Sequence, residues 1–208
     1  MGKVLGAVLA GGRSSRFGSD KGAALFDGIT LADHAGAAIA QFVEAVIRVG
    51  GAGGIADVPA SGLGPPGGIA AALDHAARSG FDSVLTIACD MPRLPGGLVE
   101  ALLVQAPAYC TGAPVLGHWP VSALDQLLAL LTETMILTPF VLSEVEKPSP
   151  AGIRRIPTSL DTNGGRRTPI NFKLGPSIRS WASTIGAIPI ESPQSIANIN
   201  TPADLLAL

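Results

Sequence analysis

A glycine turn followed by basic residues lies near the start of the chain, directly after a short apolar run. Residues 4–8 have the pattern of a buried strand, and Gly11 and Gly12 follow closely. Adjacent glycines let the backbone bend sharply, and successive N–H groups in such a bend bind anions. Arg16 and Lys21 add the charge and the donors that suit phosphate oxygens. The stretch therefore predicts a binding site for the triphosphate of a nucleotide.

The glycine turn also has a simpler interpretation, a Gly/Ser-rich surface loop with solvated cations. It is not a Walker A loop, because the G-x-x-x-x-G-K-[ST] spacing is absent. A second glycine-rich segment, residues 62–67, formally matches G-x-G-x-x-G. Pro65 and Pro66 remove N–H donors from that segment, and it does not follow the first strand. It is therefore not interpreted as a dinucleotide fingerprint.

Asp90 is the strongest candidate for a metal ligand. It comes shortly after residues 81–88, whose apolar sequence predicts a central strand. A carboxylate at the carboxyl end of such a strand lies where open α/β sheets bind ligands. Mg²⁺ needs only one or two protein carboxylates beside phosphate oxygens and water. The alternative is a turn aspartate shortly before Pro92, and Cys89 is expected to be buried packing rather than a nucleophile.

The elements that must position these residues alternate between strands and helices. Strands are predicted at residues 4–8, 43–49, 55–58, 81–88, 108–110 and 187–190, with a short strand and turn at 23–28; helices are predicted at 30–43, 68–78, 95–105, 124–131 and 175–184. Thr30 or Asp33 is the expected cap of the first helix. Five prolines break any long element over residues 132–173. This order predicts an α/β, three-layer, Rossmann-like fold with a mostly parallel central sheet.

The bulk composition narrows the class of protein. Hydrophobic residues make up 47% and charged residues 14% of 208 residues, which favours one globular domain with a sizeable core. The net charge of −2 does not suggest a nucleic-acid binder. Cys89 and Cys110 form neither a disulfide framework nor a structural zinc site, so a reduced, cytoplasmic setting is expected. No signal peptide or long apolar span is seen, and no membrane association is expected.

Several motifs resemble those of a known family. Residues 9–21, L-A-G-G-R-S-S-R-F-G-S-D-K, resemble the L-A-G-G-x-S-x-R-[MF]-G-x-x-K motif of the MobA-like nucleotidyltransferases. The double glycine is similar to that of the molybdenum cofactor guanylyltransferases, whereas cytidylyl relatives more often carry Ala-Ala-Gly. Further segments resemble the family's G-P-L-x-G, C-D-x-P, H-P-x-x-A-L and N-x-N-T-P motifs, at residues 62–69, 89–92, 117–124 and 198–202.

The chain also departs from the family pattern at defined places. Pro66 stands where the family usually has leucine, and Trp119 is inserted or substituted beside His118. Gly50 and Gly51 occupy the end of the second strand, where the family often has asparagine. The family crosses the region of residues 132–173 in fewer residues. This stretch is therefore interpreted as an insertion in a single domain spanning residues 1–208.

The resemblance implies a set of site residues. It implies nucleotide contacts from Leu9, Ala10, Gly11, Gly12, Lys21, Asp57 and Asp90. By the same resemblance Arg16, Lys21 and Asp90 are the catalytic residues, with Arg16 and Lys21 on the phosphates and Mg²⁺ on Asp90. The resemblance also implies that the segment with His118 lines the pterin side. Trp119 either stacks on a pterin or fills the core. Asn198 and Asn200 either reach the substrate or only precede a helix that starts at Thr201 and Pro202.

The function that the resemblance implies is transfer of GMP from GTP to molybdopterin, or to the molybdenum cofactor, with release of pyrophosphate. The implied protein partners are the molybdenum insertase and the enzymes that receive the finished cofactor. Two alternatives stay open. One is a cytidylyl- or sugar-phosphate nucleotidyltransferase of the same fold. The other is a carrier that binds GTP or a pterin without catalysis.

Overall fold

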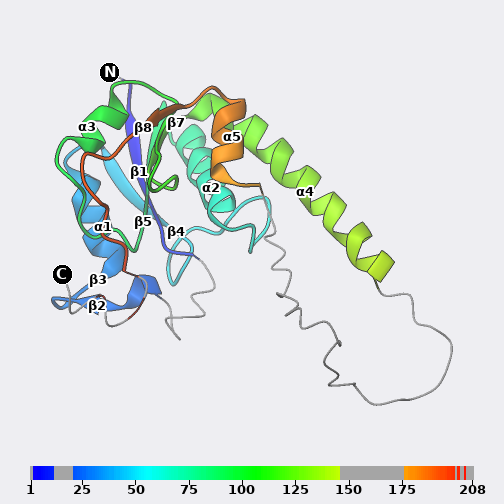
Figure 1. The fold of residues 1–208 in the computed structure, drawn as a ribbon, viewed down its shortest axis with the longest axis horizontal. Coiled ribbons are helices and arrows are strands. Elements are labelled where there is room, and N and C mark those ends of the chain that lie inside the picture. Colours follow the sequence, from blue (N-terminus) through cyan, green and yellow to red (C-terminus); the bar gives the residue numbers. More distant parts are fainter. Residues whose placement is uncertain (1, 12–20, 146–175, 200, 202–203, 205–208) are drawn as a thin grey trace, which may run out of the picture.

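A mixed sheet forms the centre of the protein. The structure is a computed structural model that describes residues 2–11, 21–145, 176–199, 201 and 204, with only the backbone for residues 137–145. Within these residues the sheet has the strand order β4-β1-β5-β7-β6-β8 (Figure 1). β7 runs antiparallel to both of its neighbours, and the other pairs are parallel. The strands are β1 (Val4–Leu9), β4 (Ala45–Val49), β5 (Ser83–Ala88), β6 (Ala108–Cys110), β7 (Gly117–Pro120) and β8 (Ile188–Ile190).

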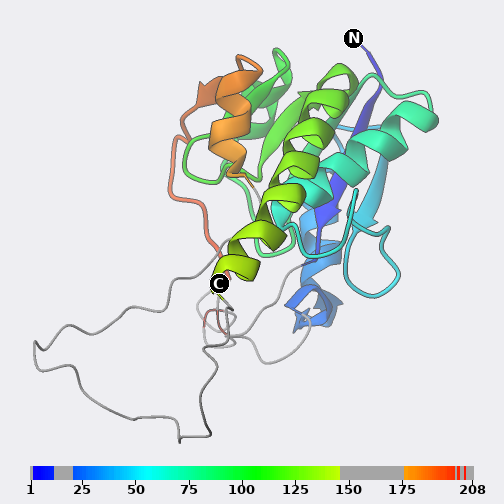
Figure 2. The same cartoon turned by 90° about the vertical axis from the view of Figure 1, so that its right-hand side faces the viewer.

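Helices cover both faces of this sheet, which confirms the predicted three-layer α/β fold. α1 (Leu31–Ala40) and α3 (Leu98–Leu103) pack on one face; α2 (Pro65–Arg78), α4 (Leu124–Val145) and α5 (Ile178–Thr184) pack on the other (Figures 1 and 2). β1 is buried along its whole length. Because side chains alternate along a strand, Leu5 and Leu9 enter the α2 side and Val4 and Val8 the α1 side.

Short elements connect the first strand to the first helix. These are η1 (Lys21–Ala23), a 3-10 turn, and the hairpin strands β2 (Leu25–Phe26) and β3 (Ile29–Thr30); a second 3-10 turn, η2 (Val121–Ala123), precedes α4. Thr30 caps α1, because its hydroxyl accepts a hydrogen bond from the Asp33 N–H at 3.1 Å. α2 begins after Gly64, which has φ +70°. Pro65 is tolerated at its first position because that N–H has no partner in a helix anyway.

Most predicted elements lie within three residues of their expected bounds, but the strand at residues 55–58 is wrong. Ile55 makes only one parallel bridge to Val49. Three residues further on, the Val58 N–H donates to the Gly67 carbonyl at 3.3 Å and not to a strand. The chain therefore leaves the sheet to reach the first turn of α2 and cannot extend the strand.

The helix predicted at residues 124–131 is longer than expected. α4 continues to Val145 and passes through Pro139, so the first part of the predicted insertion is helical. One proline removes a single N–H donor from a helix, and here the helix continues beyond it. The rest of the predicted insertion lies outside the described residues. Among the described helices, none is both long enough and apolar enough to cross a membrane.

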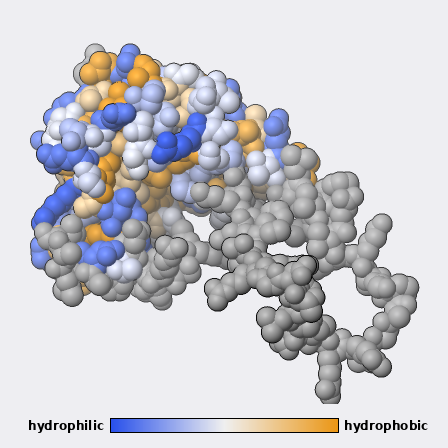
Figure 3. Space-filling model, in the orientation of Figure 1, coloured by the Kyte–Doolittle hydropathy of each residue, from blue (hydrophilic) through white to orange (hydrophobic). Residues whose placement is uncertain are grey.

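The surface seen in Figure 3 mixes polar and apolar residues. Exposed large apolar side chains among the described residues include Leu25 and Ile29, on the paired strands β2 and β3, and Val104, just after α3. Scattered exposed apolar residues of this kind are normal for folded proteins and indicate no particular partner.

Candidate active site

Three parallel strands end together and define the candidate site. The Ala10 N–H donates to the Val49 carbonyl at 2.8 Å, and the Cys89 N–H donates to the Leu9 carbonyl at 3.0 Å. These bonds fix the carboxyl ends of β4, β1 and β5 side by side. In open α/β sheets ligands bind outside such strand ends, because the loops that follow diverge there.

The loops after β1 and β4 pack against each other through glycine backbone. Gly50 has φ +73°, and a Cβ placed on it would lie 2.6 Å from the Gly11 Cα. No side chain fits there without moving one of the two loops. The Gly50-Gly51 departure from the family's asparagine is therefore explained locally, because the backbone of one loop fills the space that a side chain would need.

A cleft of about 760 Å³ lies beside these loops. Its lining residues are Leu9, Gly11, Val49, Gly50, Gly51, Ala56, Asp57, Ser61, Gly62, Gly64, Pro65 and Gly68. Half of the lining is glycine, so backbone rather than side chains forms much of the wall. A wall of this kind allows a planar ring or a phosphate to approach the backbone closely.

Asp57 is the ionisable residue that lines this cleft. Its carboxylate lies near two glycines, since a Cβ on Gly68 would be 3.6 Å and one on Gly11 4.0 Å from its Oδ1. Partial burial raises the pKa of Asp57, and a hydrogen bond from the Gly62 N–H opposes that rise. The carboxylate is thus a half-buried acceptor that lies close to the backbone of Gly11 and Gly68.

Lys21 and Asp90 meet at the end of β5. The Lys21 Nζ lies 2.8 Å from the Asp90 Oδ2, and the two side chains are 15% and 23% exposed. The backbone of Asp90 is also held, because its carbonyl accepts the Ile199 N–H at 3.0 Å. A cation from the segment after β1 and an anion from the end of β5 therefore face each other across 69 residues of sequence.

The residues around Asp90 fit a magnesium ion that has few protein ligands. The Asp90 Oδ1 is buried and has no hydrogen-bond partner among the described residues. A buried carboxylate oxygen without a partner is costly, and a hard cation or its bound water would satisfy it. The described part of the chain contains no group of three or more His, Cys, Asp or Glu that could hold a metal by itself. Water, together with the phosphates of a nucleotide when one is bound, would complete the coordination.

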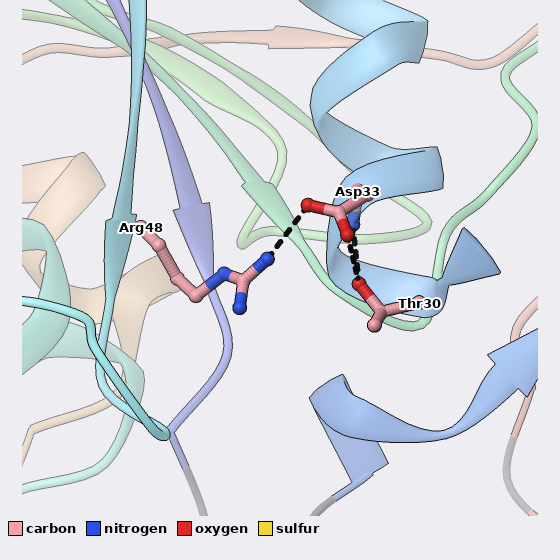
Figure 4. A network of polar contacts seen from close by, with 3 residues as sticks. All are labelled: Thr30, Asp33 and Arg48. Carbon is pink, nitrogen blue, oxygen red and sulfur yellow. Dashed lines mark hydrogen bonds and ion pairs between the residues drawn. The ribbon is translucent and has the colours of Figure 1, made fainter.

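A polar network holds β4 against α1 just before the glycine loop. Figure 4 shows Arg48 of β4 reaching Asp33 of α1, at 2.7 Å. Asp33 also accepts the Thr30 hydroxyl at 2.6 Å, in addition to the capping bond described above. Because Arg48 immediately precedes Val49, this network stabilises the position from which the loop at Gly50 leaves the sheet.

The structure brings together most of the predicted site residues that it describes. Leu9, Gly11 and Asp57 line the cleft, and Lys21 pairs with Asp90. Ala10 is buried and its N–H is used by Val49, so that donor is not available to a nucleotide. The predicted residues Gly12, Arg16 and Asn200 lie outside the described residues. Asn198 lines a separate hollow of about 530 Å³ beyond the ends of β6 and β8.

Trp119 belongs to the core, which decides between its two predicted roles. It is fully buried, donates from Nε1 to the Thr86 hydroxyl at 2.9 Å, and packs against Trp181 with ring centroids 4.7 Å apart. A ring with no exposed surface cannot stack on a bound pterin. The alternation of β7 places its neighbour His118 on the opposite face of the sheet.

His118 is likewise a buried structural residue, so the expectation that it lines a pterin site is wrong. Its Nε2 lies 2.8 Å from the Ser83 hydroxyl. Its Nδ1 lies 3.2 Å from the Leu102 carbonyl and 3.3 Å from that of Gln105. Burial lowers the pKa of His118, and the two carbonyls partly oppose this. The neutral ring joins β5 to the end of α3.

One backbone donor takes part in the site without any signal in the sequence. The Ile199 N–H donates to the Asp90 carbonyl at 3.0 Å. Every residue except proline carries such a donor, so residue type does not mark it. Ile199 lies between the two asparagines of the N-x-N-T-P segment, and that motif was the only indirect indication.

Comparison with known proteins assigns this arrangement to a family. Residues 6–138, which include most of β1, the residues that line the cleft and Asp90, match the MobA-like NTP transferase domain. The chain belongs to the MobA-like NTP transferase family. The motifs quoted at residues 9–21, 62–69, 89–92 and 117–124 lie within the matched range, and the one at residues 198–202 lies outside it.

Relatives of this chain carry a more specific name. The molybdenum cofactor guanylyltransferase of Rhodobacter capsulatus is 39% identical over 117 residues, which cover 51% of this chain and 61% of that protein. That of Sinorhizobium fredii (strain NBRC 101917 / NGR234) is 35% identical over 147 residues, which cover 61% of this chain and 67% of that protein. The chain thus spans less than two thirds of the Rhodobacter relative.

The fold agrees with a solved member of the MobA-like group. The crystal structure of molybdopterin-guanine dinucleotide biosynthesis protein A from Archaeoglobus fulgidus superposes with a TM-score of 0.59 at 20% identity. The match covers 98% of this chain and 95% of that chain. At this identity the likeness establishes the fold of a MobA-like NTP transferase, and the chemistry has to be argued from the site.

Proposed function

We propose that this MobA-like protein transfers GMP from GTP to the terminal phosphate of molybdopterin or of the molybdenum cofactor. The observation that carries the proposal is the Lys21–Asp90 pair, 2.8 Å apart, at the same sheet edge as a glycine-lined cleft. A cation for phosphates and a carboxylate for a divalent ion are the parts that nucleotidyl transfer requires. The names of the two relatives support the choice of GTP and molybdopterin.

The reaction needs positioning and charge more than a covalent catalyst. An oxygen of the acceptor phosphate forms a bond to the α-phosphorus of GTP. The bond from that phosphorus to the bridging oxygen breaks, and its electron pair leaves with pyrophosphate. A phosphate monoester is largely ionised near neutral pH, so no histidine base is needed. Lys21 would donate to the phosphates and stabilise the charge that develops on the leaving pyrophosphate.

Asp90 would hold the metal, which we propose to be Mg²⁺. When bound, this ion supplies neutralisation of phosphate charge and fixes the geometry of in-line attack. Asp90 would contribute its Oδ1, which is buried and has no partner among the described residues. We also propose the molybdenum insertase and the cofactor-receiving enzymes as protein partners and the cytoplasm as location, on the resemblance alone.

Asp57 supports guanine as the base. Guanine presents two adjacent donors, N1–H and the exocyclic amino group, and a carboxylate can accept both at once. Cytosine presents one amino donor on its corresponding edge, so it satisfies such a carboxylate less well. The half-buried Asp57 lines the same cleft as Gly11 and Gly68, and the cleft volume of about 760 Å³ is large enough for a base.

The test is release of pyrophosphate from each of the four ribonucleoside triphosphates, with Mg²⁺ and an acceptor that contains molybdopterin. We expect release with GTP, and a reduced preference for GTP over CTP in Asp57→Asn. Release with CTP instead would identify a cytidylyltransferase of the same fold. Binding of GTP without release from any nucleotide would support the carrier alternative and contradict the proposed reaction.

A further inference from the structure

The two oxygens of the Asp90 carboxylate have different environments. Oδ2 is paired with the Lys21 ammonium at 2.8 Å. Oδ1 is buried and has no hydrogen-bond partner among the described residues. One side chain thus carries both the contact that neutralises it and the free acceptor that a metal would use. A divalent cation on Oδ1 would lie close to the ammonium on Oδ2.

Two cations compete for a single carboxylate in this arrangement. The ammonium already neutralises the charge that would attract a metal, and it repels a second cation at short range. Both side chains are largely withdrawn from water, so solvent screens this repulsion incompletely. The site therefore disfavours a metal for as long as Lys21 stays on Asp90.

The backbone that carries Lys21 is held in place, so the pair can open by movement of the Lys21 side chain. The backbone of η1 is anchored, because the Ala24 N–H donates to the Lys21 carbonyl at 3.2 Å and the Leu31 N–H donates to the Ala24 carbonyl at 2.9 Å. Gly22, the next residue, is buried. A lysine on a flexible four-carbon stem can change partner from a carboxylate to a phosphate without rearrangement of the fold.

We propose that the Lys21 ammonium, while it is paired with Asp90, prevents a metal from binding there, and that a triphosphate draws the ammonium away. Metal binding and nucleotide binding are then coupled through this one side chain. The proposal rests on the proposed function for the identity of the nucleotide. The phosphates remove the ammonium from Asp90, and the carboxylate then carries its full charge toward the metal. Because such coupling is reciprocal, bound metal strengthens nucleotide binding by the same factor by which bound nucleotide strengthens metal binding.

The first experiment measures Mn²⁺ binding to the full chain without nucleotide, by electron paramagnetic resonance of the free ion. In Lys21→Met we expect the affinity to rise by roughly tenfold or more, because the competing cation is gone. The matched control is Lys3→Met, which makes the same change of charge at an exposed lysine. Adding Asp90→Asn to Lys21→Met should remove the gain, which places the new affinity at Asp90. Thermal unfolding of each variant verifies that it is folded.

The second experiment measures GTP binding in the presence of a chelator, so that no metal takes part. Asp90→Asn should bind metal-free GTP more tightly than the wild type, since Lys21 no longer has to leave a carboxylate. If Lys21 carries the effect, Asp90→Asn should change nothing in a Lys21→Met background. If the gain is the same in both backgrounds, it reflects loss of a negative charge and the exchange is refuted.

Two further results would overturn the proposal. One is a Lys21→Met protein that binds Mn²⁺ no more tightly than the wild type. The other is an equal gain in Lys3→Met, which would indicate a general effect of net charge. The Mn²⁺ measurement contains no nucleotide and no acceptor. Its failure therefore leaves the proposed transfer standing, whereas absence of pyrophosphate release with every nucleotide would count against the transfer alone.

Discussion

The region around β7 and the ends of β4, β1 and β5 differ in how they use polar groups. Around β7, the buried His118 and Trp119 have partners for their ring N–H groups in Ser83, Thr86 or backbone carbonyls. At the ends of β4, β1 and β5, glycine backbone lines an open cleft and the Asp90 Oδ1 is left without a described partner. The Trp181 Nε1, which packs beside Trp119, is also buried without a hydrogen-bond partner among the described residues. An unpaired buried atom therefore indicates a ligand only where, as at Asp90, it belongs to a charged group at a strand end.

The largest expected effect is a loss of activity caused by a change at the ends of β4, β1 and β5. Asp90→Asn keeps the shape of the side chain but removes the charge that would hold the metal. We expect GMP transfer to fall by roughly 10³-fold, because metal stabilisation of phosphoryl chemistry amounts to several kcal/mol. Single-turnover pyrophosphate release measures this, and the midpoint of urea unfolding should change little. Turnover near that of the wild type would remove Asp90 from the metal site.

The next largest effect is a loss of stability caused by a change around β7. Trp119→Ala removes a fully buried ring that packs on Trp181, so we expect unfolding to become easier by about 3–5 kcal/mol. The affinity of the folded fraction for GTP should be unchanged. Urea denaturation followed by circular dichroism, with GTP titration of the same sample, separates the two readouts. Loss of GTP affinity without loss of stability would contradict the assignment of Trp119 to the core.

A smaller effect is expected where the two glycine loops touch. Gly50→Ala places a Cβ 2.6 Å from the Gly11 Cα and should destabilise the protein by about 1–3 kcal/mol while weakening GTP binding. Gly53→Ala is the matched control, because Gly53 also has positive φ but its Cβ would meet nothing within 4 Å. The control should lose only about 1 kcal/mol and keep its GTP affinity. Equal losses of GTP affinity in the two variants would show that the loop contact does not shape the cleft.

The smallest effect is a dependence of stability on pH. Burial lowers the pKa of His118 below its ordinary value of 6.5. As pH falls below 6.5 the unfolded chain binds a proton that the folded protein resists, so the contribution of His118 to stability decreases toward acid pH. His118→Gln should flatten this slope in urea unfolding between about pH 5 and 7.5. An identical slope in the variant would show that another group titrates.

Local signals in the sequence predict much of the fold. The apolar run of β1 and the Thr30 cap of α1 are confirmed because each depends on residues close together in the chain. The predicted strand at residues 55–58 is wrong because the Val58 N–H donates to the carbonyl of Gly67 in α2, a contact that the local sequence does not show. The length of α4 is also missed, since a proline weakens a helix without always ending it.

In the candidate site, too, features that depend on nearby residues are predicted and contacts between distant residues are not. The position of Asp90 at a strand end is predicted by topology alone, because parallel strands share one ligand edge. Its contact with Lys21 joins segments 69 residues apart, so only the folded structure shows which oxygen is paired. For Trp119, residue type fits both a core and a stacking role. The partners that decide, Thr86 and Trp181, lie far along the chain.

The most direct test of the central claim is a crystal structure of the protein with GTP and Mn²⁺, with the metal located by anomalous scattering. We predict the triphosphate at Gly11 and Lys21, the base in the cleft beside Asp57, and the anomalous peak within coordination distance of the Asp90 Oδ1. A nucleotide bound away from the ends of β4, β1 and β5, or a metal without Asp90 as ligand, would contradict the account.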